Sequence, residues 1–347
     1  MKRIGIFTSA RSDYGYLQPL IAKVHAHPFL DLSLFVSGTH YSSDYGHTLS
    51  DIQYPITHTS EIVLSHDTAS ATTKSMGLAL IQYSEQIRQQ PLDVMILLGD
   101  RFETLAMAIA CYNSYIPIAH ISGGETTEGS LDDGYRWAIS QFAAIHFVYT
   151  DQYGVNVVKR TWNDNVHNIG LLPLETIPYI PRPDSPRGYV CIVHPPGQYW
   201  IQELLWALPK AEPVIFIQPN TDAGSRSIWD AIVRYCPNFD NVRLALNMDR
   251  DKFLNTLGNT RALIGNSSAG IYEAPWLGTP TINIGDRQKG RLQAKSIINC
   301  PGHEMAIRDA IDQITNLPSR SEWELPFVKR PSSDIIIDKL GEFYRKH

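Results

Sequence analysis

The chain has 347 residues, of which 43% are hydrophobic and 19% charged, a composition that is ordinary for a folded protein and too apolar for a disordered one. At about 150 residues per domain, the length corresponds to two domains. Lys and Arg total 30 and Asp and Glu total 35, so the net charge of −5 argues against nucleic acid or a membrane surface as a partner.

The amino-terminal segment and the cysteines predict a soluble cytoplasmic protein. The first apolar run, residues 4–7, is followed by Arg11, which comes too early for the apolar core of a signal peptide. No apolar run reaches the ~18 residues of a membrane span. The cysteines lie far apart, without the spacing of a metal or redox site, and are expected to be reduced thiols: Cys111, Cys191, Cys236 and Cys300.

Apolar runs of β-type residues alternate with helical patterns along the first half of the chain. Apolar residues at helical spacing follow the first run, between Leu17 and Val24. Continuous apolar strands that alternate with helices are typical of a parallel sheet covered on both faces. The predicted strands are residues 3–8, 32–36, 93–98, 116–121 and 145–149.

Prolines crowd residues 173–186 and predict a linker, after which the alternation restarts. We expect an α/β protein with domains at residues 1–172 and 187–330 and a closing helix within 331–347. Two doubly wound domains of this kind form a cleft between the carboxyl ends of their sheets, where ligands bind. The later predicted strands are residues 189–193, 213–218, 242–246, 262–264 and 281–284.

An anion-binding pattern follows the strand at 262–264. Asn266 is a natural N-cap, and Ser267 and Ser268 would then lie in the first helical turn, where amide groups and the helix dipole favour an anion. Glu273 lies further along, within reach of a ribose if the phosphates lie on the serines. A plain capped helix would have the same residues, so both interpretations stand at this point.

A basic loop follows the next strand and contains Arg287, Lys289 and Arg291. The fixed fork of an arginine suits a diphosphate. A solvated basic loop is the alternative for each residue taken singly. The nearby serine-rich segment favours a phosphate site.

Polar residues also follow the strands of the first half. Arg11 lies in the turn after the first strand, where a phosphate or sugar would approach. Asp100 and Arg101 directly follow the most apolar strand. An aspartate in that place is either catalytic or the cap of the next helix.

The loop after the strand at 116–121 is rich in glycine and acidic residues. It contains Glu125, Glu128, Asp132 and Asp133. Acidic residues near a helix start often interact only with its dipole. Four of them in one loop favour acid–base chemistry.

Histidines and glycines limit the choice of cofactor. His194 ends a predicted strand and is followed by two prolines that stiffen its loop, which favours a functional role; the evidence for His40 is weaker. The histidines and carboxylates lack the spacing of a metal site, and no Gly-x-Gly-x-x-Gly follows the first strand. We therefore expect no metal, nicotinamide or flavin.

Together these motifs resemble the UDP-N-acetylglucosamine 2-epimerase family, and specifically its hydrolysing branch, which feeds the synthesis of sialic and related nonulosonic acids such as legionaminic acid. The motifs run in family order from the first strand to about residue 300 and are specific in combination. They are residues 9–15, 37–40, 45–48, 98–103, 120–133, 194–195, 219–224, 265–268 and 283–291.

The resemblance implies two Rossmann-like domains that face each other across a cleft, a GT-B-like architecture, with UDP bound mainly by the C-terminal domain. Gly15 and Met248 fall at positions where backbone groups contribute. Asp100, Asp132 and His194 fall at catalytic positions. The remaining family contacts to UDP map onto Arg11, Arg101, Asn220, Ser267, Ser268, Glu273 and Arg287.

The chain departs from the family pattern in the acidic loop. Relatives often have a carboxylate directly before the Gly-Gly pair, where this chain has Ser122. The acid–base role would then pass to Glu125. Because the loop is one residue longer than in some relatives, Asp132 and Asp133 remain alternatives for the next acid.

The activity that the resemblance implies is hydrolytic 2-epimerisation without a cofactor. A UDP-N-acetylglucosamine-type donor would lose UDP through a 2-acetamido-glucal, and hydration would release a free manno-configured sugar such as N-acetylmannosamine. The family also implies a homo-oligomer, a dimer or a tetramer. The rivals are a GT-B glycosyltransferase, a UDP-sugar sensor without turnover, and a non-hydrolysing epimerase.

Overall fold

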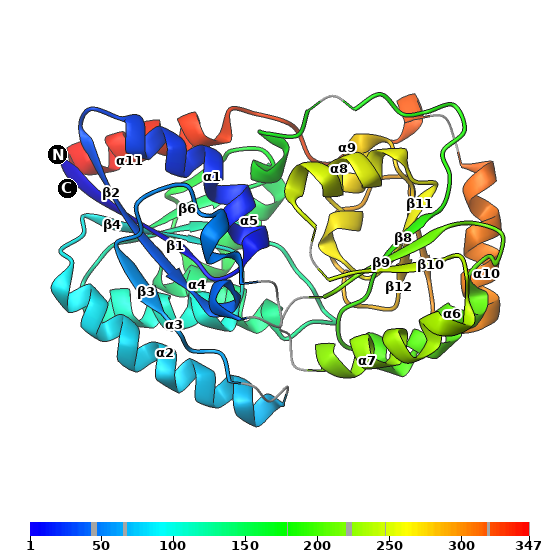
Figure 1. The fold of residues 1–347 in the computed structure, drawn as a ribbon. Coiled ribbons are helices and arrows are strands. Elements are labelled where there is room, and N and C mark those ends of the chain that lie inside the picture. Colours follow the sequence, from blue (N-terminus) through cyan, green and yellow to red (C-terminus); the bar gives the residue numbers. More distant parts are fainter. Residues whose placement is uncertain are drawn as a thin grey trace. The chain divides into compact units, whose positions relative to one another are not determined.

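The computed structural model describes residues 1–42, 47–64, 68–178, 180–219, 224–246, 248–317 and 320–346. The chain forms two compact units (Figure 1). Unit 1 comprises Met1–Thr126, Leu131–Thr176 and Phe327–His347. Unit 2 comprises Thr127–Ser130 and Ile177–Pro326, so the chain enters it twice.

Unit 1 is built on a seven-stranded parallel sheet in the order β3-β2-β1-β4-β5-β6-β7. Strand order reverses at β1, which lies between β2 and β4, and ligands of such sheets bind beyond the carboxyl ends at this point. The strands are β1 (Lys2–Thr8), β2 (Leu30–Ser37), β3 (His58–Ser60), β4 (Val94–Leu98), β5 (Ile118–Ile121), β6 (Ile145–Val148) and β7 (Val166–Asn168).

Helices cover both faces of this sheet (Figure 1). Phe7 and Leu97 of the sheet pack with Tyr83 of α2, Met107 of α3 and Ile139 of α4 in one apolar cluster, while α1 and α11 lie together on the opposite face. The helices of unit 1 are α1 (Arg11–Ala26), α2 (Ala69–Gln89), α3 (Phe102–Asn113), α4 (Asp132–Phe142), α5 (Asp151–Thr161) and α11 (Ser332–Lys346).

Unit 2 repeats the plan with a six-stranded parallel sheet in the order β10-β9-β8-β11-β12-β13. Its strand order reverses at β8, between β9 and β11. The strands are β8 (Tyr189–Ile192), β9 (Val214–Ile217), β10 (Val242–Ala245), β11 (Ala262–Gly265), β12 (Thr281–Ile284) and β13 (Ile297–Cys300).

The core of unit 2 lies between this sheet and three helices. Leu204 of α6, Ile228 of α7 and Ile307 of α10 pack on Cys191 and Ile264 of the sheet. The helices α8 and α9 lie together on the other side (Figure 1). The helices are α6 (Ile201–Ala207), α7 (Ser225–Tyr235), α8 (Arg250–Asn259), α9 (Glu273–Leu277) and α10 (Glu304–Gln313).

The prediction of an α/β fold with parallel sheets is confirmed, and all ten predicted strands are present. The sequence analysis missed β3, β7 and β13, which are sheet-edge strands of three or four residues with partly exposed side chains. Among the described residues, no helix combines the length and the apolar character needed to cross a membrane.

Candidate active site

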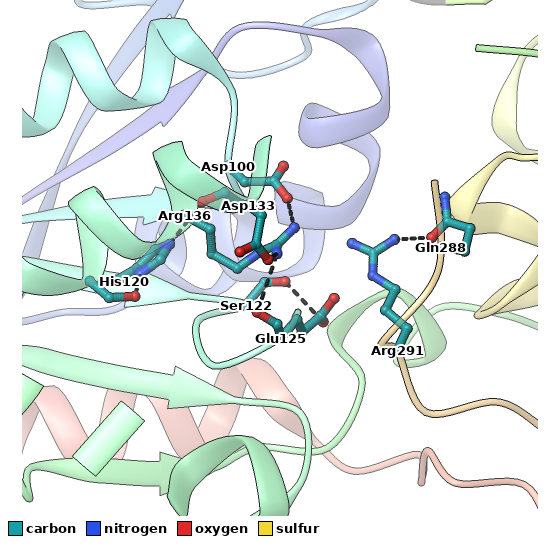
Figure 2. Close-up of polar contacts among 10 residues, drawn as sticks. Asp100, His120, Ser122, Glu125, Asp133, Arg136, Gln288 and Arg291 are labelled. Atoms are coloured by element: carbon teal, nitrogen blue, oxygen red, sulfur yellow. Dashed lines mark hydrogen bonds and ion pairs between the residues drawn. The ribbon is translucent and has the colours of Figure 1, made fainter. Parts of the chain in front are cut away.

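A buried arginine organises the carboxyl edge of the unit 1 sheet. Arg136 lies on α4, and its side chain is fully buried. Its Nη2 pairs with Oδ2 of Asp100, and its Nη1 lies 3.2 Å from Oδ1 of Asp133 (Figure 2). The same Nη1 donates to the main-chain oxygen of Glu125 at 3.3 Å. One guanidinium therefore joins three acidic residues from two loops and a helix start.

Asp100 follows β4 directly but does not cap the next helix. Helix α3 begins at Phe102, and its N-cap residue is Arg101, whose side chain makes no capping hydrogen bond. The Asp100 carboxylate instead faces Arg136 (Figure 2). The capping explanation for Asp100 is therefore wrong, and its carboxylate belongs to the Arg136 cluster.

The four acidic residues of the loop after β5 differ in burial and in their partners. Glu125 is fully buried, and its Oε1 accepts a hydrogen bond from Ser122 Oγ at 3.3 Å. Asp132 is the first residue of α4 and is half-buried, whereas the next residue, Asp133, contacts Arg136. Glu128 lies in the short segment assigned to unit 2, where it pairs with Lys289 at 2.7 Å.

His120 supports the turn that carries Asp100. Its Nε2 lies 2.8 Å from the main-chain oxygen of Gly99, and its Nδ1 lies 3.0 Å from Ser140 Oγ. Burial lowers the pKa of His120 to about 4, so the ring is neutral near pH 7. His120 thus acts as a neutral hydrogen-bonding spacer beneath the site.

A second charged group lies around Arg101. Its Nε is 3.5 Å from Oε2 of Glu103, a fully buried residue in the first turn of α3. Burial and the nearby Asp100 charge raise the pKa of Asp13, while Arg101 opposes this shift. Asp13 lies in the first turn of α1, and Arg11 and Gly15 of the same helix are half-buried.

His40 is structural. It is fully buried, with Nε2 3.1 Å from Thr8 Oγ1 and Nδ1 2.9 Å from Thr48 Oγ1. Desolvation lowers the pKa of His40 to about 4. The ring therefore ties the end of β1 to the segment after β2 without carrying charge.

In unit 2, Asn266 joins the loops that follow β8 and β11. Its Oδ1 accepts from the His194 amide at 2.7 Å, and its Nδ2 donates to the His194 oxygen at 2.9 Å. Its own main-chain oxygen accepts from Gln288 Nε2 at 2.8 Å and from Arg287 Nη1 at 3.3 Å. His194, Asn266 and Arg287 are thereby held together in one polar group.

The expected cap at Asn266 is wrong. Ser267 is the N-cap of a 3-10 turn, η7 (Ser268–Gly270), and its hydroxyl accepts from the Ala269 amide at 3.3 Å. The helix that follows, α9, has five residues. Asn266 does not cap because its side chain is committed to His194, and the segment has a short turn in place of a long helix start.

The three basic residues of the loop after β12 have different partners. Arg287 contacts the Asn266 main chain, whereas Lys289 pairs with Glu128 at an exposed position. Nη1 of Arg291 donates to Gln288 Oε1 at 2.6 Å (Figure 2), and its guanidinium lies over the Tyr272 ring, 5.1 Å from the centroid. Arg287 is therefore tied directly to the Asn266 loop by its side chain, as its neighbour Gln288 is.

The remaining predicted contacts are also in unit 2. Glu273 is buried at the start of α9, with Oε1 3.7 Å from Arg250 Nη1 of α8. Met248 is buried before α8. Asn220 and the motif residues 45–46 and 221–223 lie outside the described residues.

Sequence reasoning missed Arg136, Ser122 and Gln288 as members of the site. Arg136 has one local signal, its position three residues after Asp133 on a helix, where side chains meet. Ser122 stood out only as a departure from the family pattern, and Gln288 had no signal, because the contacts of both side chains form only in the folded chain. Within the described residues, no group of three or more His, Cys, Asp or Glu could hold a metal ion.

Comparison with known proteins places this arrangement in a family. The family model for UDP-N-acetylglucosamine 2-epimerase matches residues 22–341. A Campylobacter jejuni relative, "GDP/UDP-N,N'-diacetylbacillosamine 2-epimerase (hydrolyzing)", is 32% identical over 86% of this chain and 84% of its own. An Escherichia coli relative, "Polysialic acid biosynthesis protein P7", is 31% identical over 88% of this chain and 84% of its own.

A solved structure of similar fold is also an epimerase. The crystal structure of a UDP-GlcNAc 2-epimerase from Neisseria meningitidis bound to UDP-GlcNAc superposes with a TM-score of 0.83 at 16% identity, over 99% of this chain and 100% of the other. Because the family model matches residues 22–341 and a relative is 32% identical over 86% of the chain, the chain belongs to the UDP-N-acetylglucosamine 2-epimerase family.

Proposed function

We propose that this protein is a hydrolysing UDP-sugar 2-epimerase. A base removes the proton at carbon 2 of the sugar, the bond from carbon 1 to the UDP oxygen breaks, and a double bond forms between carbons 1 and 2. Water then adds its hydroxyl to carbon 1, and a proton returns to the opposite face of carbon 2. The products are UDP and a free manno-configured N-acetyl sugar.

The observation that carries the proposal is the Arg136 cluster. Proton removal and return need two carboxyl groups in defined places, and Arg136 contacts Asp100, Asp133 and the Glu125 main chain. The ion pair with Arg136 holds the Asp100 carboxylate in place directly after β4. We therefore assign Asp100 as the base at carbon 2. Glu125 and Asp132, from the acidic loop and the start of α4 next to this cluster, are the candidates that return a proton.

We assign nucleotide binding mainly to residues 187–330 and sugar chemistry to residues 1–172. Hydroxyl and guanidinium groups in unit 2 would stabilise the negative charge that develops on the departing diphosphate. The support is that Asn266 holds His194 and Arg287 in one polar group. The residues assigned to UDP are Arg11, Gly15, Arg101, Asn220, Met248, Ser267, Ser268, Glu273 and Arg287.

Two donor classes are candidates for the substrate. Relatives from Campylobacter jejuni and Legionella pneumophila carry names that specify N,N'-diacetylbacillosamine, and a 31% identical relative from Neisseria meningitidis is a "UDP-N-acetylglucosamine 2-epimerase". Both sugars present an N-acetyl group at carbon 2. We infer that this chain acts on a UDP-linked sugar of this shared type and supplies sialic- or legionaminic-type acid synthesis.

The test is incubation of the purified protein with UDP-N-acetylglucosamine and, separately, with its 2,4-diacetamido-6-deoxy analogue. The expected result is UDP and a free manno-configured sugar from one of them, without an acceptor. UDP release only after an acceptor is added would identify a glycosyltransferase. A UDP-linked epimer would identify a non-hydrolysing epimerase, and binding without turnover a sensor.

We also propose a cytoplasmic homo-oligomer. The four cysteines are unpaired, as is usual in a reducing compartment. The contacting helices α2 and α3 expose the side chains of Ile81 and Tyr112, which are 66% and 55% exposed and which a second subunit would cover. Light scattering after size-exclusion chromatography tests this, and a mass of one chain would contradict it.

A further inference from the structure

Ser122 has a backbone conformation that serine rarely adopts. Its φ is +73°, in the left-handed region that favours glycine. The residue is buried, and its amide donates to the Phe147 oxygen of β6 at 2.9 Å, so the conformation is fixed by the sheet. A serine at such a position indicates that the side chain contributes something that glycine would not.

The hydroxyl of Ser122 contacts a buried carboxylate. Its Oγ donates to Glu125 Oε1 at 3.3 Å (Figure 2). Glu125 is fully buried. A buried carboxylate needs hydrogen-bond donors that hold it in place, and Ser122 supplies one of them.

Other residues hold the main chain of this turn. Asn156 Nδ2 donates to the Gly124 oxygen at 3.0 Å, and Arg136 Nη1 donates to the Glu125 oxygen at 3.3 Å. A Cβ at Gly124 would lie 2.2 Å from the Tyr153 oxygen, so the turn packs closely on α5. The path of the loop is therefore secured without the Ser122 hydroxyl, which contacts the Glu125 carboxylate.

We propose that Ser122 is a positioning residue that orients the Glu125 carboxylate for proton transfer, a role that rests on the proposed function. The strained backbone at Ser122 places its hydroxyl toward Glu125. Loss of the hydroxyl should therefore lower turnover and leave nucleotide binding unchanged. This effect can be measured separately from the effect of relieving the backbone strain.

Two substitutions at one position separate these effects. Ser122→Ala removes the hydroxyl and keeps the strain, whereas Ser122→Gly removes both. We expect both variants to lower kcat about tenfold, since small errors of placement have effects of this size or larger, with KM and UDP affinity within about twofold of wild type. The Tm of Ser122→Gly should exceed that of Ser122→Ala by about 1–3 °C.

Tyr115 provides a matched control. It also has a positive φ, +56°, but its side chain is 95% exposed and lies after α3, away from the acidic loop. Tyr115→Gly and Tyr115→Ala should show a similar difference in Tm while both keep wild-type kcat. Wild-type kcat in Ser122→Gly would overturn the proposal, as would a loss of kcat that follows Tm across the four variants.

A readout without catalysis keeps this test distinct from that of the function. If the wild-type protein releases no UDP from any donor, the proposed function fails. Crystal structures of wild type and Ser122→Gly at one pH then decide the positioning role. A displaced Glu125 carboxylate in the variant supports it, and an unchanged carboxylate position overturns it.

Discussion

The two units share one plan and differ in what they place at the carboxyl edge of their sheets. Unit 1 has charged groups that are buried and paired, with Arg136 between Asp100 and Asp133 and Arg101 beside Glu103. Unit 2 joins its loops through amides, because Asn266 contacts His194 and Gln288 contacts Asn266. The same topology thus carries buried ion pairs at the carboxyl edge of one sheet and amide hydrogen bonds between loops at that of the other.

This difference has an energetic consequence. Removing one partner of a buried ion pair leaves an uncompensated charge and costs about 3–5 kcal/mol. Removing one amide hydrogen bond costs about 1–3 kcal/mol when a buried partner is left unpaired. The charged cluster of unit 1 should therefore be the more sensitive of the two to substitution, in both stability and turnover.

The largest expected effect is that of Arg136→Met. The substitution leaves Asp100 and Asp133 near each other without their shared cation, so we expect a loss of about 3–5 kcal/mol in the free energy of unfolding and no detectable turnover. Gln288→Met is the matched variant in unit 2 and should cost about 1–3 kcal/mol. Denaturant unfolding measures both, and equal losses would contradict the comparison.

Asp100→Asn should lower turnover while UDP affinity stays near wild type. The amide cannot accept the proton from carbon 2, and general-base catalysis contributes about 10²–10⁴-fold. UDP release and calorimetric UDP binding are measured on the same purified variant. A folded variant with near-normal turnover would remove Asp100 from the mechanism.

Acid should destabilise unit 1 through its buried imidazoles. Burial lowers the pKa of His146 to about 3 and those of His40 and His120 to about 4. The unfolded chain therefore binds these protons first, at about pH 6.5, and stability falls as the pH drops from there toward 4. We expect a loss of a few kcal/mol per buried histidine.

His146→Leu isolates one of these groups. Neither ring nitrogen of His146 has a hydrogen-bond partner among the described residues, so the substitution removes no hydrogen bond. The free energy of unfolding should equal or exceed that of wild type at pH 7 and should fall less steeply toward pH 4. Urea unfolding at several pH values gives both curves, and parallel curves would refute the titration of His146.

The smallest effects concern the basic loop of unit 2. Ser268→Ala combined with Arg287→Ala should weaken UDP binding by about 1.5–3 kcal/mol, the range of hydrogen bonds to charged groups. Lys289→Met is the control, because this lysine forms an exposed ion pair with Glu128, and such pairs contribute about 0–1 kcal/mol. Calorimetry that shows unchanged affinity in the double variant would contradict the assigned diphosphate contacts.

The sequence predicted the strands well because their signal is local. The apolar run 94–98 is buried over its whole length, whereas β7 and β13 are short edge strands. Their side chains are partly exposed, so they lack a clear apolar pattern. Apolar periodicity reports burial, so it identifies the centre of each sheet better than its edges.

The site was less predictable because its partners are distant in sequence. Asp100 and Arg136 are 36 residues apart, and Asn266 and His194 are 72 apart. Asparagine is a common N-cap residue, but hydrogen bonds with the main chain of His194 fix the orientation of the Asn266 side chain. The residue types identified these positions as candidates for the site, whereas the partner of each side chain depends on the fold.

The most direct test of the account follows the proton at carbon 2. The wild-type protein is incubated in deuterated water with the donor from which it releases UDP, and the free sugar is analysed by NMR. Elimination and hydration predict one deuterium at carbon 2 of a manno-configured product, formed at the rate of UDP release. A released sugar that retains its original hydrogen at carbon 2 would show that this bond never breaks and would contradict the mechanism.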